Sequence, residues 1–243
     1  NSVIFVPQNK DFSYTADDIM NFFDDKDIGL LVVINPDNPS GNYIPKSDLL
    51  RLVNWAAKKG IKIVIDESFV DFSDCEDSTI ILQDILDANK HLYVVKSISK
   101  SYGVPGIRLG ILASGDVDTI SFIKRDVAIW NINSFGEFYM QIAEKYKKDY
   151  AAALEKFRTE RKRFENELNN INGIRVIPTQ ANYFMVELTG KITAEELTKK
   201  MLLIHNILIK DLSSKVGKQY VRIAIRNTED NNRLIEAFKT EVY

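Results

Sequence analysis

The chain has 243 residues, of which 45% are hydrophobic and 27% are charged, and its formal net charge is −2 at pH 7. This length allows one large domain or two small ones, and a charge so close to zero gives no indication of nucleic-acid binding. No apolar run is long enough to span a membrane, and the single cysteine, Cys75, suits a reducing compartment, so we expect a cytoplasmic protein.

The first half of the chain alternates apolar segments with amphipathic ones. Four apolar segments, rich in valine, isoleucine and leucine, predict strands at residues 3–6, 30–34, 61–65 and 92–96. This alternation favours an α/β fold with a mostly parallel sheet and helices on both faces.

The segments between these strands carry helix signals. Thr15 is suited to cap a helix that continues to about Phe23, and Ser47 is suited to cap a helix that ends at Gly60. A short helix is predicted near residues 80–86.

Right-handed crossovers would bring the carboxyl ends of the parallel strands to one edge of the sheet. The loops at residues 35–41, 66–69 and 97–100 would then share that edge, where open α/β sheets bind ligands. Residues 97–107 are too few for a helical crossover, so we expect the strand near residues 108–113 to be antiparallel.

The second half becomes largely helical after Asp116 and then forms a smaller α/β unit. One long helix is predicted over residues 146–171, and Asn172-Gly173 ends it. We place a domain boundary near residue 150, which divides the chain into a large domain, 1–150, and a small C-terminal domain, 151–243. In the small domain we expect strands at 174–177, 183–188, 207–210 and 220–225, and helices at 193–205 and from Thr228.

Lys100 lies just past a predicted strand end, in SISKSYGVPGIRLG, among hydroxyl side chains and with Arg108 eight residues further on. A held and partly desolvated lysine amine can form a Schiff base with a carbonyl. Hydroxyls, backbone N–H groups and a guanidinium are the groups that bind a phosphate. An aldehyde and a phosphate held together indicate pyridoxal 5'-phosphate, whereas an ordinary surface lysine is the alternative.

These residues resemble the lysine motif of fold-type I pyridoxal-phosphate enzymes, the class I and II aminotransferases. The resemblance is greatest to histidinol-phosphate aminotransferases and threonine-phosphate decarboxylases. It implies that Lys100 is the catalytic lysine and that Ser97, Ser99 and Arg108 hold the cofactor phosphate. The spacing of SxSK and GxRxG is the most specific signal in the chain.

The resemblance also implies roles for three residues upstream. Asp66, at the start of DESFVDF, matches the aspartate that keeps the pyridine nitrogen protonated, so that the ring is a better electron sink. Asn38, in NPDNPSG, matches the asparagine that hydrogen-bonds the phenolic oxygen of the cofactor, and Asn35 is the less suitable choice. Phe69 replaces a tyrosine that many relatives carry and cannot donate a hydrogen bond. Threonine-phosphate decarboxylases resemble the chain at this position.

Further residues are expected on the substrate side. Arg222, in YVRIAIRN, matches the arginine that binds the substrate carboxylate, a task that suits a planar guanidinium. Arg226 would share its face of the strand and could bind a second anion such as a phosphate, or it could be a solvated loop arginine. Asn133 and Trp130, in WNIN, resemble a substrate-side loop, although Trp130 could equally lie in the core.

We therefore predict a pyridoxal-phosphate aminotransferase that acts through a Schiff base on Lys100. There are two alternatives: an amino-acid-phosphate decarboxylase on the same fold, and a catalytically silent dimerisation domain of a fused protein. Expected partners are a small-molecule amine and a 2-oxo acid, with no nucleic acid, metal or membrane, in a homodimer. The chain begins with Asn1 rather than methionine and lacks the glycine loop and stacking aromatic that relatives carry before Asn35, so we expect a piece of a longer polypeptide.

Overall fold

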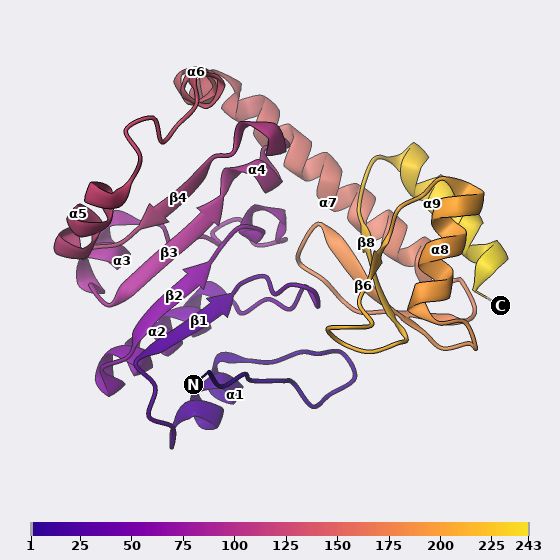
Figure 1. The fold of residues 1–243 in the computed structure, drawn as a ribbon, viewed down its shortest axis with the longest axis horizontal. Helices are drawn as coiled ribbons and strands as arrows, with labels where there is room; N and C mark the ends of the chain where they lie inside the picture. Colours follow the sequence, from indigo (N-terminus) through magenta and orange to yellow (C-terminus); the bar gives the residue numbers. More distant parts are fainter. Residues whose placement is uncertain (1, 243) are drawn as a thin grey trace.

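The computed structural model describes residues 2–242, which form two four-stranded sheets connected by one long helix (Figure 1). The first sheet has the order β1-β2-β3-β4, in which β1, β2 and β3 are parallel and β4 is antiparallel to β3. Its strands are β1 (Leu30–Ile34), β2 (Lys62–Asp66), β3 (Leu92–Ser97) and β4 (Gly110–Ala113). The mostly parallel α/β sheet and its antiparallel last strand are both confirmed.

Three helices cover one face of this sheet. They are α1 (Ala16–Phe23), α2 (Lys46–Lys59) and α3 (Gln83–Ala88), and they pack on buried alternate residues of the strands such as Val33, Ile63 and Val94. On the opposite face Leu30 and Val32 of β1 are 56% and 58% exposed. Within residues 2–242 the helical cover of β1 is therefore one-sided.

Local signals predict the helix ends with mixed success. Thr15 caps α1 in a capping box with Asp18, and Gly60 ends α2 in the left-handed conformation with φ of 70°, both as predicted. The prediction that Ser47 caps α2 is wrong. The helix begins at Lys46, two residues before the start that a cap at Ser47 would give, and the carbonyl of Pro45 accepts the N–H of Leu49.

The predicted strand at residues 3–6 is also wrong. The segment is extended but pairs with no strand of the described chain, and Ile4 is 76% exposed. Its order comes from side-chain packing instead, because the Phe5 ring lies edge-on against Tyr14 and Phe22. An apolar run forms a strand only where a neighbour supplies hydrogen bonds.

Short turns and helices complete the first half. The functional loops contain η1 (Val70–Phe72), α4 (Ile98–Ser101) and η2 (Pro105–Ile107), and the segments beyond β4 form α5 (Val117–Asp126), α6 (Ser134–Ala143) and η3 (Glu144–Tyr146). The predicted long helix is α7 (Lys147–Asn169), which runs from the first half of the molecule to the second in Figure 1. A boundary near residue 150 would fall in its first turn and stays a prediction.

The second sheet is antiparallel, in the order β5-β6-β8-β7. Its strands are β5 (Ile174–Val176), β6 (Tyr183–Leu188), β7 (Lys210–Asp211) and β8 (Tyr220–Ala224). One face packs on α7, α8 (Ala194–His205) and α9 (Thr228–Glu241) around Phe184, Val221 and Phe238. The strand predicted at residues 207–210 is displaced toward the C-terminus, because Ile207 packs into this core instead of pairing.

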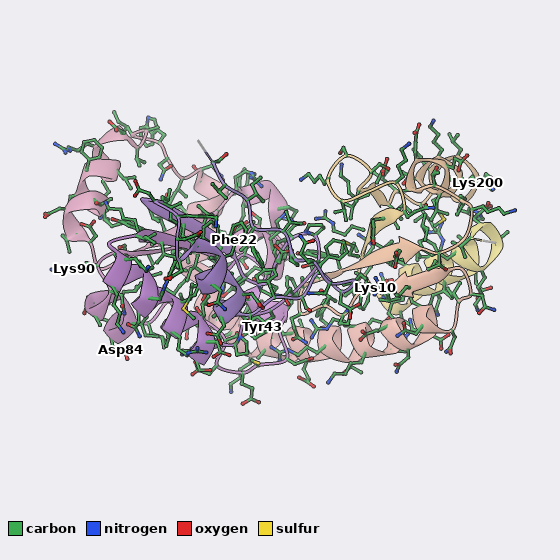
Figure 2. The ribbon with its side chains drawn as sticks, turned by 90° about the horizontal axis from the view of Figure 1, so that it is seen from below. Lys10, Phe22, Tyr43, Asp84, Lys90 and Lys200 are labelled. Atoms are coloured by element: carbon green, nitrogen blue, oxygen red, sulfur yellow. The ribbon has the colours of Figure 1, made fainter. Side chains whose placement is uncertain are left out.

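The N-terminal segment bridges the two halves. Phe12 packs with Ile177, Met185 and Tyr220 of the second half, and Arg175 donates to the Lys10 carbonyl at 2.7 Å. Figure 2 shows Lys10 at the junction between the two sheets. No helix among residues 2–242 is long and apolar enough to cross a membrane.

Candidate active site

The three loops predicted to share one edge of the first sheet do lie together. The Asn35 N–H donates to the Asp66 carbonyl at 2.9 Å, and the Glu67 N–H donates to the Val95 carbonyl at 2.8 Å. The Ser97 N–H donates to the Ser68 hydroxyl at 3.0 Å. The loops that follow β1, β2 and β3 are thus connected in a chain of hydrogen bonds.

Lys100 lies in α4, directly after β3, and its side chain is exposed. Its Nζ is 5.8 Å from the centroid of the Phe69 ring. Lys96, four residues earlier, is instead 11% exposed and forms a 2.6 Å ion pair with Asp71. Lys100 is therefore the lysine of this strand end that can meet a ligand.

Asp66 and Glu67 are adjacent acids with different surroundings. The Asp66 carboxylate accepts the Ser68 N–H at 2.8 Å, at the sheet edge. Glu67 is fully buried and accepts hydrogen bonds from the Thr79 hydroxyl at 2.6 Å and the Ile80 N–H at 2.7 Å. Burial raises the pKa of the Glu67 carboxyl. Asp66 is the last residue of β2 and is partly exposed, whereas the buried Glu67 anchors the segment that follows.

Asn38 meets Arg222 across the boundary between the two halves. Arg222, on β8, donates from Nη1 to Asn38 Oδ1 at 2.6 Å. Its guanidinium also lies over the Tyr183 ring, 4.8 Å from the centroid. Asn35 is 1% exposed and exchanges hydrogen bonds with the backbone of Ile44, so it is the structural asparagine of this loop.

Phe69 forms the floor between these groups. It is 8% exposed, and its ring meets Tyr183 edge-on with centroids 5.2 Å apart. The Tyr183 hydroxyl donates to the Asp37 carbonyl at 2.6 Å. Burial, reinforced by the charge of Asp37, raises the pKa of the Tyr183 phenol, so the phenol stays a donor.

Ser97, Ser99 and Arg108 are the predicted phosphate ligands. Among residues 2–242, the Ser99 hydroxyl is one of three buried side-chain polar atoms without a hydrogen-bond partner. Arg108 is exposed, has φ of 54° after η2, and donates to the Pro105 carbonyl at 3.2 Å. An unpartnered hydroxyl close to a lysine and a strand-end carboxylate fits pyridoxal phosphate, which needs donors for its phosphate and an acid for its ring nitrogen.

The predicted WNIN residues have contacts of a different kind. Asn133 caps α6, where it accepts the Gly136 N–H at 3.0 Å and donates to the Ile107 carbonyl at 2.8 Å, so it supports the turn before Arg108. Trp130 is 90% exposed, which contradicts a place in the core of residues 2–242.

The structure does not bring Arg226 to Arg222. Strand β8 ends at Ala224, so the alternation on which the prediction depends stops before Arg226. The Arg226 side chain forms a 2.7 Å ion pair with Asp230 of α9 and lines a hollow of about 260 Å³ with Asn206. A role for Arg226 in binding a second anion stays a prediction.

Several residues of the site carry no recognisable sequence signal. Tyr183 stands in YFMVEL, which is typical of a core strand, and Ser68 links Asp66 to Ser97 only through the fold. Asp71 binds both Lys96 and the Tyr150 hydroxyl of α7, at 2.6 and 2.9 Å. That Tyr183 and Arg222 share one face of the sheet follows only from the pairing of β6 with β8.

Comparison with known proteins agrees with the predicted family. The sequence profile of the family "Aminotransferase class I and II" matches residues 2–238. CMP-5'-(3-aminopropyl)phosphonate synthase of Streptomyces rubellomurinus is 34% identical over 93% of this chain and 36% of its own length. L-serine phosphate decarboxylase of Sulfurospirillum multivorans is 31% identical over 98% of this chain and 62% of its own length.

A solved structure, the histidinol-phosphate aminotransferase from Clostridium acetobutylicum, superimposes with a TM-score of 0.87 at 28% identity, covering 99% of this chain and 71% of that one. The fold is that of a fold-type I pyridoxal-phosphate enzyme. The chain belongs to the class I and II aminotransferase family, and membership implies pyridoxal phosphate as its cofactor. The chain spans about one third to two thirds of the length of the two relatives named above.

Proposed function

We propose that the protein is a pyridoxal-phosphate-dependent decarboxylase of an O-phosphorylated amino acid, with transamination as the second candidate. The supporting observation is a row of contacts in which Lys100, Phe69, Tyr183 and Arg222 follow one another at 5.8, 5.2 and 4.8 Å. The row puts an amine that can react with a carbonyl and a guanidinium that can bind an anion on either side of two aromatic rings.

Each residue has a distinct task in this proposal. Bound pyridoxal phosphate supplies an electron sink for a bond broken at the substrate α-carbon. Asp66 holds a proton on the pyridine nitrogen, Ser97, Ser99 and Arg108 bind the phosphate, and Asn38 bonds the phenolic oxygen. Lys100 gives a proton to the α-carbon after carbon dioxide leaves, or removes the α-proton in transamination.

The substrate anion that Arg222 binds should differ between decarboxylation and transamination. A guanidinium paired with the substrate carboxylate stabilises a charge that is lost in decarboxylation, so it would bind the ground state more tightly than the transition state. The same pair suits transamination, in which the carboxylate is retained. We therefore propose that Arg222 binds the substrate phosphate in the decarboxylase and would bind the carboxylate in an aminotransferase.

Two observations put decarboxylation first, although the sequence motif by itself favoured transamination. The relatives include the L-serine phosphate decarboxylase and the CMP-5'-(3-aminopropyl)phosphonate synthase, whose names both refer to a phosphorus-containing anion. Phe69 also stands where the motif comparison associates phenylalanine with threonine-phosphate decarboxylases. The histidinol-phosphate aminotransferase structure keeps transamination as the second candidate.

The test uses cofactor-loaded protein, a 2-oxo acid that can accept the amino group, and a panel of amines with and without carboxylate and phosphate, headed by O-phospho-L-serine. Released carbon dioxide and newly formed 2-oxo acid are measured separately. Decarboxylation predicts carbon dioxide without 2-oxo acid, and a KM increase in Arg222→Ala that is confined to phosphorylated amines. Formation of 2-oxo acid, with a KM increase for every carboxylate-bearing amine, would replace the first candidate with the second.

The panel also decides the role of Arg226. If Arg226 binds the substrate phosphate, Arg226→Ala should lower kcat/KM for phosphorylated amines alone. The loss should be about 10- to 100-fold, which is the strength of a charge-assisted hydrogen bond. Equal losses for all amines would leave it structural, as its ion pair with Asp230 favours. We further propose a homodimer, which sedimentation of the protein would test.

A further inference from the structure

Tyr183 contacts three residues of the candidate site at once. It is 4% exposed and stands at the start of β6. The Arg222 guanidinium lies over its ring, 4.8 Å from the centroid, and its hydroxyl donates to the Asp37 carbonyl at 2.6 Å. The Phe69 ring forms a T-shaped pair with it, with centroids 5.2 Å apart.

The strand register places Tyr183 beneath Arg222. In the antiparallel pair of β6 and β8, Met185 lies opposite Arg222 and Ala224 lies opposite Tyr183. Tyr183 and Arg222 are therefore diagonal neighbours on one face of the sheet, a separation that aromatic and long side chains can bridge. The ring is fixed by its strand and by Phe69, so it limits the directions in which the flexible arginine can point.

Tyr183 holds both ends of the contact between Arg222 and the loop. Arg222 Nη1 donates to Asn38 Oδ1 at 2.6 Å, and the Tyr183 hydroxyl binds the carbonyl of the preceding residue, Asp37. A guanidinium has five N–H donors in one plane. The Tyr183 ring covers one face of the Arg222 guanidinium, and Asn38 accepts one of its N–H groups. A pair of in-plane N–H donors therefore stays available to an anion.

We propose that Tyr183 is a positioning residue that orients Arg222 for bidentate capture of the substrate anion. The proposal rests on the anion-binding role of Arg222 stated above and adds the residue that sets its geometry. Loss of the ring should weaken anion binding by about 3- to 30-fold, the range of a partly buried cation–π contact.

The experiment is a double-mutant cycle on cofactor-loaded protein, with kcat and KM measured for O-phospho-L-serine. Tyr183→Leu should raise KM about 3- to 30-fold with kcat within about two-fold. Tyr183→Phe keeps the ring and loses the hydroxyl, so its KM should rise less. In the Arg222→Ala background, Tyr183→Leu should change KM by less than about two-fold, because the residue through which it acts is absent.

A packing control separates positioning from stability. Phe72 belongs to the same buried cluster as Tyr183, and its ring packs at a tilt against Phe157 with centroids 4.8 Å apart, so Phe72→Leu also removes buried aromatic packing. It should lower the unfolding midpoint and leave KM unchanged. An equal KM effect of Tyr183→Leu in both backgrounds, or none in the wild type, would overturn the positioning role. An unchanged KM in Arg222→Ala would refute the anion-binding role of Arg222 and the positioning role with it, whereas the decarboxylase proposal itself is tested by the release of carbon dioxide.

Discussion

Arg161 offers the most direct test of how the two halves of the molecule are held together. It lies on α7 with its side chain 2% exposed. Its Nη1 donates to the carbonyl of Phe72 at 2.7 Å and to that of Ala181 at 3.2 Å, and its Nη2 lies 2.9 Å from Asp74 Oδ1. Arg161→Ala removes one side chain that binds the loop after β2 and the segment before β6 together.

The magnitude follows from the groups left behind. Two buried carbonyls would each lose a charge-assisted hydrogen bond, at a cost of about 1–3 kcal/mol for each unsatisfied group. Asp74 is 38% exposed and would recover water, so its contribution is small. We expect a total loss of about 3–5 kcal/mol, the range found when one partner of a buried pair is removed. Domains of this kind have only ~5–15 kcal/mol of stability in total.

Urea unfolding followed by circular dichroism measures this loss through the midpoint and the slope. Lys162→Ala is the matched control, because Lys162 is the next residue and its Nζ lies 3.9 Å from the same Asp74, but its side chain is 68% exposed. Its loss should stay below about 0.5 kcal/mol. A loss below about 1 kcal/mol in Arg161→Ala, or one equal to that of the control, would refute the reasoning.

Three further predictions concern single residues. Borohydride reduction of cofactor-loaded protein should attach the pyridoxyl group to the peptide that contains Lys100, and labelling of Lys96 would contradict the assignment. Asp66→Ala should lower turnover about 100- to 1,000-fold, as the loss of a preorganised electrostatic group does, and unchanged turnover would exclude its role at the ring nitrogen. Hydrogen bonds from Arg163, with those of Asn231 and Thr228, lower the pKa of Glu160 from 4.5 to about 2. Because the pKa is lower in the folded state, the ionised Glu160 stabilises the fold above pH 4.5, and this stabilisation is lost as the pH falls toward 2. The urea midpoints of the wild type and Glu160→Gln should therefore differ at pH 6 and converge at pH 2. A constant difference between the two midpoints across this range would contradict the prediction.

Local chemistry in the sequence determined much of the fold. The capping box of Thr15 and Asp18 needs residues only three apart, and Gly60 ends its helix through its own backbone freedom. The bounds of β6, Tyr183–Leu188, agree with the prediction because a buried apolar run between turns carries its own limits. Alternation of strands and helices also sufficed to bring the loops of Asn38, Asp66 and Lys100 to one edge.

Tertiary structure decided what depends on partners distant in the chain. Residues 3–6 have the composition of a strand but no pairing neighbour among residues 2–242, and composition cannot supply one. Arg226 has the parity of Arg222, yet β8 ends at Ala224 and parity has no meaning beyond the strand. Tyr183 reads as a core residue, and only the register of β6 against β8 puts it beneath Arg222. Periodicity and caps act over a few residues, whereas register and strand ends follow from packing across the whole chain.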